Sequence, residues 1–290
     1  MWTVHAPGFQ HSFGALMLLL TSFTLALVLS AEAQTESLLY TFADASEGGN
    51  PPAGVIFGPD GNLYGVGREG GDLNCPLTLG DGCGVVFQLM RSADGSWSEN
   101  VIYAFTGGTD GALPTSPLVS DKAGNLYGTT YVGGTHFNCS GYACGTIFEL
   151  SPASSGTWNF TVLHDFDGAD GAFNIGGLIL DGAGNLYGAT FEGGTGNCHL
   201  YLHCGTVFRL SPTSSGQWTE TVLHDFAGGP DGGQAEGTLA LDSSGNLYGT
   251  TLFGGLRPLQ LFQLRNCLRT IAKLRWLMDT HGDPQLHRNR

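Results

Sequence analysis

The stretch Gly184-Asn185-Leu186-Tyr187-Gly188 occurs four times in this chain and decides its fold. The other copies stand at 61–65, 124–128 and 245–249, so that successive copies are offset by 63, 60 and 61 residues. Self-similarity at a nearly fixed period is the signature of proteins built from tandem structural units. We therefore expect a repeat protein.

Each unit has the pattern of four short β-strands. A short apolar stretch such as 177–181 leads into an Asp-x-x-Gly-Asn turn, in which Gly or Asn takes a positive φ. Asn-Leu-Tyr-Gly-Thr-Thr then begins a second strand that is rich in aromatic and β-branched residues. Gly-Thr-Ile-Phe-Glu-Leu (145–150) alternates apolar and polar residues, as a third strand with one buried face should. A Ser-Ser-Gly-x-Trp turn leads into the fourth strand, 159–164.

Four antiparallel strands per unit predict an all-β fold, a β-propeller-like array of about four four-stranded blades. A solenoid is the alternative architecture, although solenoid units usually have roughly 20–45 residues. We expect the repeat domain over residues 34–256, with repeats near 43–105, 106–166, 167–226 and 227–256.

The two ends of the repeat region suggest how the last blade is completed. Residues 38–42 align with 101–105, the fourth strand of a unit, and the segment 36–42 is expected to complete the blade formed by 227–256. Leu261-Phe262-Gln263-Leu264 resembles Val86–Leu89 and is the candidate third strand of that blade.

Composition limits the function classes. The 17 Phe, 9 Tyr and 5 Trp residues are enough to build a large core, which argues against disorder. The net charge of −14 excludes nucleic acid and anionic lipid surfaces as partners, because phosphate contacts need Lys and Arg.

Residues 1–33 are predicted to be a signal peptide. Residues 15–29 form an apolar run that is short for a bilayer core of about 30 Å, and Ala31-Glu32-Ala33 is a small-x-small cleavage site. The segment before the run has no Lys or Arg, and a retained membrane anchor is the alternative. We expect a protein that is secreted, extracellular or on the outer cell surface, with membrane contact only through this signal peptide.

The chain changes character after residue 256. Its net charge is −19 up to that point and +5 over the divergent basic tail, 257–290. The tail is interpreted either as an artefactual ending produced by a frameshift or gene-model error, or as a genuine amphipathic helix.

The repeated core, the Gly-Gly after it, Gly-Thr-Val-Phe at 205–208 and Val-Leu-His-Asp-Phe at 222–226 resemble the GloVer (Gloeobacter/Verrucomicrobia) tandem repeat family of secreted bacterial proteins. The resemblance covers about residues 36–256. It implies export, a propeller-like array and often a C-terminal surface anchor, but it implies no reaction. The fourth unit departs from the pattern, because it lacks the Cys loop and the Gly-Thr-Val-Phe strand.

Six cysteines fall into pairs that bracket the same loop of three successive units. In an exported protein this pattern predicts one local disulfide per unit, while metal binding is the alternative because histidines lie in or beside these loops. The pairs are Cys75/Cys83, Cys139/Cys144 and Cys198/Cys204. Cys267 is left over.

Other candidate residues weaken when the units are aligned. His164 and His224, each followed by Asp, suggest a catalytic pair, but Tyr40 and Tyr103 occupy the same column, which favours a structural role. An acidic column suits Ca²⁺, yet its Asp-Gly sequences are more typical of turns. This column consists of Glu47, Asp110, Asp170 and Asp231.

The Cys loops vary most between units, and we expect them to form a ligand-binding rim. Their aromatic rings and amides suit a glycan, or else a peptide. The candidate residues are Phe137, Tyr142, His199, Tyr201 and His203.

Two function classes remain open. Because most polar positions repeat, we expect a non-catalytic binding or scaffold protein, without a cofactor and monomeric. The alternative is a secreted propeller enzyme of the lyase or glycosidase type that acts on extracellular polysaccharide.

Overall fold

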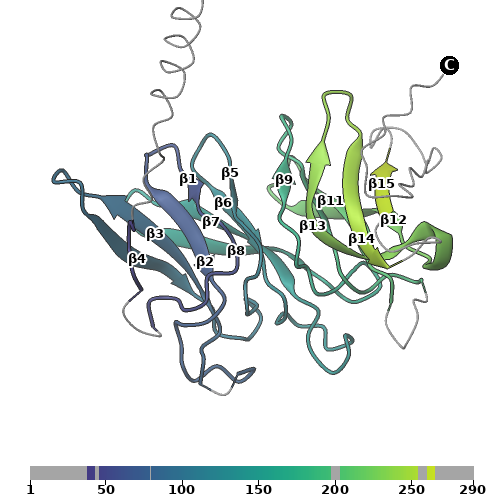
Figure 1. The fold of residues 1–290 in the computed structure, drawn as a ribbon, viewed down its shortest axis with the longest axis horizontal. Coiled ribbons are helices and arrows are strands. Elements are labelled where there is room, and N and C mark those ends of the chain that lie inside the picture. Colours follow the sequence, from purple (N-terminus) through teal and green to yellow (C-terminus); the bar gives the residue numbers. More distant parts are fainter. Residues whose placement is uncertain (1–37, 43–45, 79, 197–202, 254–259, 265–290) are drawn as a thin grey trace, which may run out of the picture. The chain divides into compact units, whose positions relative to one another are not determined.

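The computed structural model describes residues 38–42, 46–78, 80–196, 203–253 and 260–264. The four sheets that these residues form belong to one compact unit, Tyr40–Arg290 (Figure 1). The predicted signal peptide 1–33 and most of the tail 257–290 lie outside the described residues. Among the described residues, no helix is long and apolar enough to cross a membrane.

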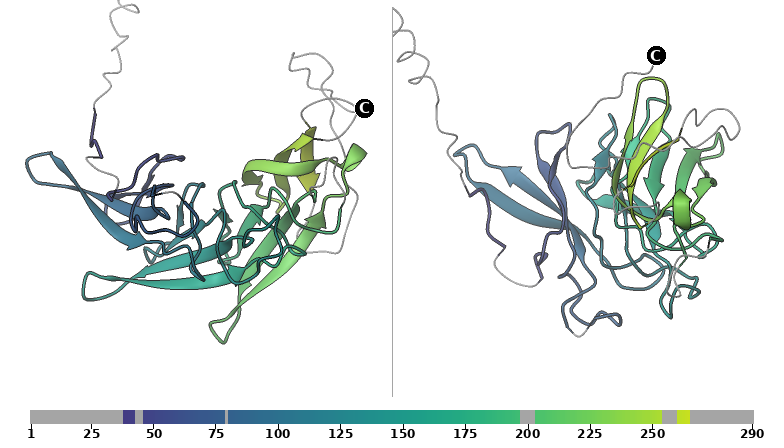
Figure 2. Two further views of the ribbon diagram at one scale, coloured as in Figure 1. Left: turned by 90° about the horizontal axis from the view of Figure 1, so that it is seen from below. Right: turned by 45° about the vertical axis from the view of Figure 1, so that its right-hand side comes forward.

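The fold is all-β and consists of successive antiparallel sheets, so the predicted β-propeller-like array is confirmed (Figures 1 and 2). In each sheet the strands lie in the order in which they occur in the sequence. The first sheet comprises β1 (Ile56–Phe57), β2 (Leu63–Gly67), β3 (Val85–Arg91) and β4 (Trp97–Ala104). The second comprises β5 (Val119–Ser120), β6 (Leu126–Thr129), β7 (Thr146–Pro152) and β8 (Trp158–Asp165). The third comprises β9 (Ile179–Leu180), β10 (Leu186–Ala189), β11 (Thr206–Pro212) and β12 (Trp218–Asp225).

The fourth sheet has three strands in the described part of the chain. A short 3-10 helix, Gly229–Asp231, precedes β13 (Gly233–Leu241), β14 (Leu247–Phe253) and β15 (Gln260–Leu264). β15 pairs antiparallel with β14, with Leu264 opposite Leu247. The tail therefore supplies the third strand, at the place where the sequence predicts it.

The repeated pentapeptide places a glycine in the second strand of each unit for a steric reason. A Cβ at Gly188 in β10 would lie 2.5 Å from the ring of Phe208 in β11, because the two residues are directly opposite each other. Gly65 and Gly128 meet Phe87 and Phe148 at the same distance. The glycine thus makes room for the buried Phe of the third strand.

Successive sheets are joined by pairs of phenylalanines. Phe105, which follows β4, packs edge to face on Phe148 in β7 with ring centroids 5.3 Å apart, and Phe166 packs on Phe208 at 5.4 Å. All four rings are fully buried. This contact buries apolar area between the end of one unit and the middle of the next.

Residues 38–42 make the same kind of contact with the first sheet. Phe42 packs edge to face on Phe87 in β3 with centroids 5.0 Å apart, although residues 38–42 form no strand. The Tyr40 hydroxyl donates to Glu47 at 3.0 Å, as the Tyr103 hydroxyl donates to Asp110. The segment therefore resembles the end of a fourth strand in its contacts, while its expected pairing with the last sheet stays a prediction.

Candidate functional site

The Cys loops are closed by disulfides in the first two units. Cys75 is bonded to Cys83 and Cys139 to Cys144, as the sequence predicts. Cys204 is disulfide-bonded as well, while Cys198, its predicted partner, lies outside the described residues. In the described ranges no group of three or more His, Cys, Asp or Glu side chains is arranged to hold a metal ion.

A cleft of about 480 Å³ lies beside the second Cys loop. Three segments distant in the sequence form its walls: the Cys139 loop, the turn that follows β8 and the segment that follows β10. Its polar lining includes Asn138, Asp167, Glu192 and His203. The cleft therefore unites side chains of two consecutive units.

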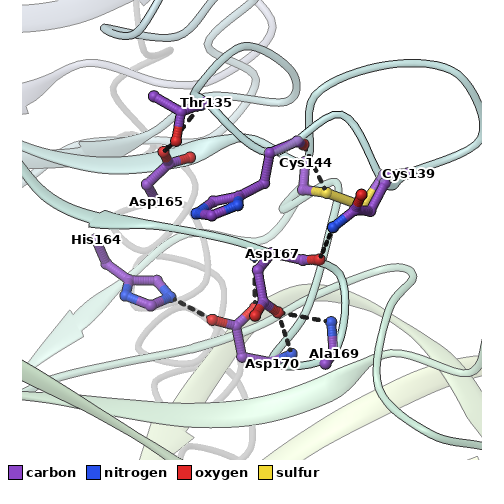
Figure 3. The surroundings of a disulfide bond; sticks show 10 residues. Thr135, Cys139, Cys144, His164, Asp165, Asp167, Ala169 and Asp170 are labelled. Atoms are coloured by element: carbon purple, nitrogen blue, oxygen red, sulfur yellow. Dashed lines mark hydrogen bonds and ion pairs between the residues drawn. A yellow bond between two sulfur atoms is a disulfide. The ribbon is translucent and has the colours of Figure 1, made fainter.

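The Cys139 loop is tied to the turn after β8 by a hydrogen bond (Figure 3). The Asn138 side-chain amide donates to the main-chain oxygen of Asp167 at 3.1 Å. The Asp167 carboxylate in turn accepts from the main-chain amides of Ala169 at 2.8 Å and Asp170 at 3.2 Å. These bonds hold the exposed Asp167 side chain at the wall of the cleft.

Glu192 is the second carboxyl group of the cleft. Its main chain is fixed by a β-bridge to Ala172, with N–O distances of 2.8 and 3.0 Å. The side chain is half-buried, and this burial raises the pKa of Glu192 above its ordinary value, although the charge of His203 acts in the opposite direction. Glu192 therefore keeps its proton to higher pH than a solvent-exposed glutamate does.

The histidines that precede Asp165 and Asp225 bind other carboxylates. His164 Nε2 lies 2.9 Å from Asp170, and His224 Nε2 lies 3.1 Å from Asp231. Asp165 accepts from the main-chain amide of Thr135 instead, at 2.9 Å (Figure 3). The column of His and Tyr rings thus pairs with the acidic column in every unit, which supports the structural interpretation of both.

The predicted rim residues have different positions. Phe137 and Tyr142 are exposed at 69% and 53% on the Cys139 loop, and His203 lines the cleft. His199 and Tyr201 lie outside the described residues. The sequence interpretation missed Glu192, although its position, directly before the Gly-Gly of the unit, holds Glu69, Val132 and Glu192 in the first three units and so does not repeat.

Comparisons with known proteins give one family match. The model of the Gloeobacter/Verrucomicrobia repeat matches residues 23–262. No curated protein matches the chain.

Two solved structures resemble the fold at low identity. One is xylan beta-1,4-xylosidase from Bacillus Halodurans C-125, with 17% identity and a TM-score of 0.36; the match covers 76% of this chain and 40% of that one. The other is the Cellvibrio cellulosa alpha-L-arabinanase complexed with arabinohexaose, with 11% identity and a TM-score of 0.33, covering 73% of this chain and 72% of that one. This chain thus spans less than half the length of the xylosidase.

Both solved structures are of enzymes, contrary to the expectation that this chain is not an enzyme, and that expectation is withdrawn. The expectation rested on the repetition of most polar positions. Glu192 shows the physical flaw in that argument, because the corresponding residue of the preceding unit is Val132. A repeated backbone does not impose repeated side-chain chemistry.

Proposed function

The chain belongs to the Gloeobacter/Verrucomicrobia repeat family, and we propose that it is an exported protein that binds extracellular polysaccharide in the cleft beside Cys139 and hydrolyses a glycosidic bond there. The observation that carries this proposal is the pair of carboxyl groups in one cleft, Glu192 with a raised pKa and the solvent-exposed Asp167. Glycosidic bond hydrolysis uses two carboxyl groups in different protonation states, one to protonate the leaving oxygen and one to act as base or nucleophile.

Each group has a distinct role in this proposal. Glu192 is the proton donor, because desolvation keeps it protonated at a pH where a free glutamate is ionised. Asp167 is the base or nucleophile, held in place by the amides of Ala169 and Asp170. Asn138 and His203 are available for hydrogen bonds with sugar hydroxyls, and the exposed ring of Tyr142 offers an apolar face on the Cys139 loop.

Two further features support the choice of ligand and compartment. The net charge of −14 disfavours anionic polymers, so a neutral glycan fits better than an acidic one. The disulfides Cys75–Cys83 and Cys139–Cys144 fit an oxidising compartment outside the cytosol. We propose in addition that the exported protein acts as a monomer.

The test is the release of reducing ends from a panel of neutral and anionic polysaccharides by the wild-type chain and by Glu192→Gln. The amide keeps the size of the side chain but cannot donate the proton, so cleavage of the neutral substrate should fall about 100-fold or more. Binding in affinity electrophoresis should persist. Cleavage by the wild-type chain should also decline as the pH rises and Glu192 ionises.

Glu69→Gln is the matched control. Glu69 occupies the same position in the first unit, where its carboxylate accepts a hydrogen bond from the Asn50 side-chain amide at 3.1 Å. The Glu69→Gln variant should cleave the substrate at the wild-type rate. Wild-type cleavage by Glu192→Gln would refute the role of Glu192. A wild-type chain that binds a polysaccharide or a peptide but cleaves no polymer would refute the hydrolytic function.

A further inference from the structure

The contact between the fourth strands of consecutive units differs between the first junction and the second. At the first junction, Tyr103 in β4 stacks on Phe160 in β8, with ring centroids 4.0 Å apart and planes 7° from parallel. The strand registers identify the same two positions one unit later. His164 takes the place of Tyr103, because His164 lies opposite Ile147 as Tyr103 lies opposite Val86. Glu220 takes the place of Phe160, because Glu220 lies opposite Leu210 as Phe160 lies opposite Leu150. An aromatic stack is thus replaced by two titratable groups.

Glu220 has an unusual environment for a carboxyl group. Glu220 is only partly exposed, and its Oε1 atom is buried without a hydrogen-bond partner among the described residues. His164, the cation-forming side chain that acts on Glu220, directs its Nε2 to Asp170 at 2.9 Å instead. A buried carboxylate oxygen without a donor is costly, whereas a protonated carboxyl tolerates the site.

The charges that act on Glu220 come from the second unit. They are the imidazole of His164 in β8 and the carboxylates of Asp167 and Asp170 in the turn after it. On β11, the residue opposite Glu220 is the uncharged Leu210, and the neighbouring Arg209 is opposite Thr221, so strand alternation directs it to the other face. Burial is the largest influence and raises the pKa of Glu220, His164 opposes it, and the carboxylates of Asp170 and Asp167 reinforce it; together they bring this pKa to about 7.

We propose that the junction between β8 and β12 is a proton-dependent contact, in which Glu220 is protonated in the packed state and its ionisation loosens β12 from the second unit. The sign follows from linkage. The pKa of Glu220 in the folded chain, about 7, exceeds the ordinary value of 4.5, so the protonated carboxyl favours folding at acid pH. That advantage is lost as the pH rises toward and through 7.

The junction between β8 and β12 adjoins the cleft. The charge of Asp167 raises the pKa of Glu220, and Asp167 also lines the cleft. The inference does not depend on any activity of the cleft, and its test uses no substrate. The proposed contact predicts that a change from mildly acidic to mildly alkaline pH alters the packing of β12 against β8, next to the turn that holds Asp167.

The first test is thermal unfolding of the full chain between pH 5.5 and 8.5. The melting temperature of the wild-type chain should fall by roughly 2–4 °C more than that of Glu220→Gln over this range. Glu220→Phe introduces the side chain that Phe160 has at the first junction, so the melting temperature of this variant should depend on pH no more than that of Glu220→Gln. Glu236→Gln, at an exposed site in β13, should behave like the wild-type chain. Equal pH dependence in the wild-type chain and in Glu220→Gln would overturn the proposal.

The second test needs no stable variant. In wild-type chain labelled with ¹³C at glutamate carboxyls, the resonance assigned to Glu220 should titrate with a midpoint near 7. Hydrogen exchange at the amides of β12, corrected for the intrinsic effect of pH, should accelerate over the same range, while that of β2 in the first sheet should not. A Glu220 midpoint near 4.5, or equal exchange behaviour of β2 and β12, would refute the proton-dependent contact.

Discussion

At the residue scale, one aspartate explains why the last three copies of the pentapeptide are preceded by the same turn. The Asp181 carboxylate accepts from the main-chain amides of Ala183 and Asn185, from the Asn185 side chain at 2.7 Å and from the Tyr187 hydroxyl at 3.0 Å. Gly184, between them, has a φ of 88°. Asp, Gly, Asn and Tyr are therefore selected together, because they form one hydrogen-bonded turn.

Replacing this aspartate should destabilise the chain. Asp181→Asn keeps one acceptor oxygen but places an amide opposite Asn185 and Tyr187, so the free energy of unfolding should fall by about 1–2 kcal/mol in urea titrations. Asp81→Asn, at an exposed site, should leave it unchanged. An Asp181→Asn variant as stable as the wild-type chain would show that the turn does not depend on its carboxylate.

The stability that the Asp181 turn contributes depends on pH with the opposite sign to the stability that Glu220 contributes. Burial alone would raise the pKa of Asp181, but the hydrogen bonds from Asn185 and Tyr187 outweigh burial and lower the pKa below 3.8. The stability that this carboxylate contributes is therefore present above pH 4 and is lost as the pH falls below its ordinary value. The Asp181→Asn variant should lose part of the acid dependence of the wild-type chain.

At the scale of the strand, the small residue in the middle of β6 fixes how closely β6 and β7 can pack. A Cβ at Gly128 would lie 2.5 Å from the Phe148 ring and 2.9 Å from the Leu118 side chain. Both neighbours are buried, so neither can move away without disturbing the core.

Gly128→Ala should therefore lower the free energy of unfolding by roughly 1–3 kcal/mol, measured by denaturant titration, because it overpacks the core. Gly182→Ala is the control, since a Cβ there has open space around it. The account of this strand fails if both alanine variants unfold at the same denaturant concentration.

At the scale of the whole molecule, the sequence predicted the repeated sheets well because each unit encodes its own turns and strands locally. The Asp-x-x-Gly-Asn turn and the alternating pattern of 145–150 each specify one local element, and the structure places both as predicted. Even β15, in a tail of different composition, is recognisable because 261–264 keeps the pattern of the third strand.

The candidate site was less predictable, for a physical reason. The cleft is formed where Asn138, Asp167 and Glu192 from separate segments meet, and alignment of the units compares equivalent positions rather than neighbouring ones. His203 was found because it lies in a Cys loop. Glu192 and Glu220 were missed because their environment depends on the adjoining unit, which no single repeat shows.

The measurement that tests the proposed function most directly is a crystal structure of the Glu192→Gln variant with an oligosaccharide of the polymer that the wild-type chain degrades. The account predicts a sugar chain across the cleft, with a glycosidic oxygen within hydrogen-bond distance of the side chain at position 192 and the Asp167 carboxylate near the anomeric carbon of the same bond. A sugar chain bound elsewhere on the molecule, with the cleft beside Cys139 empty, would contradict it.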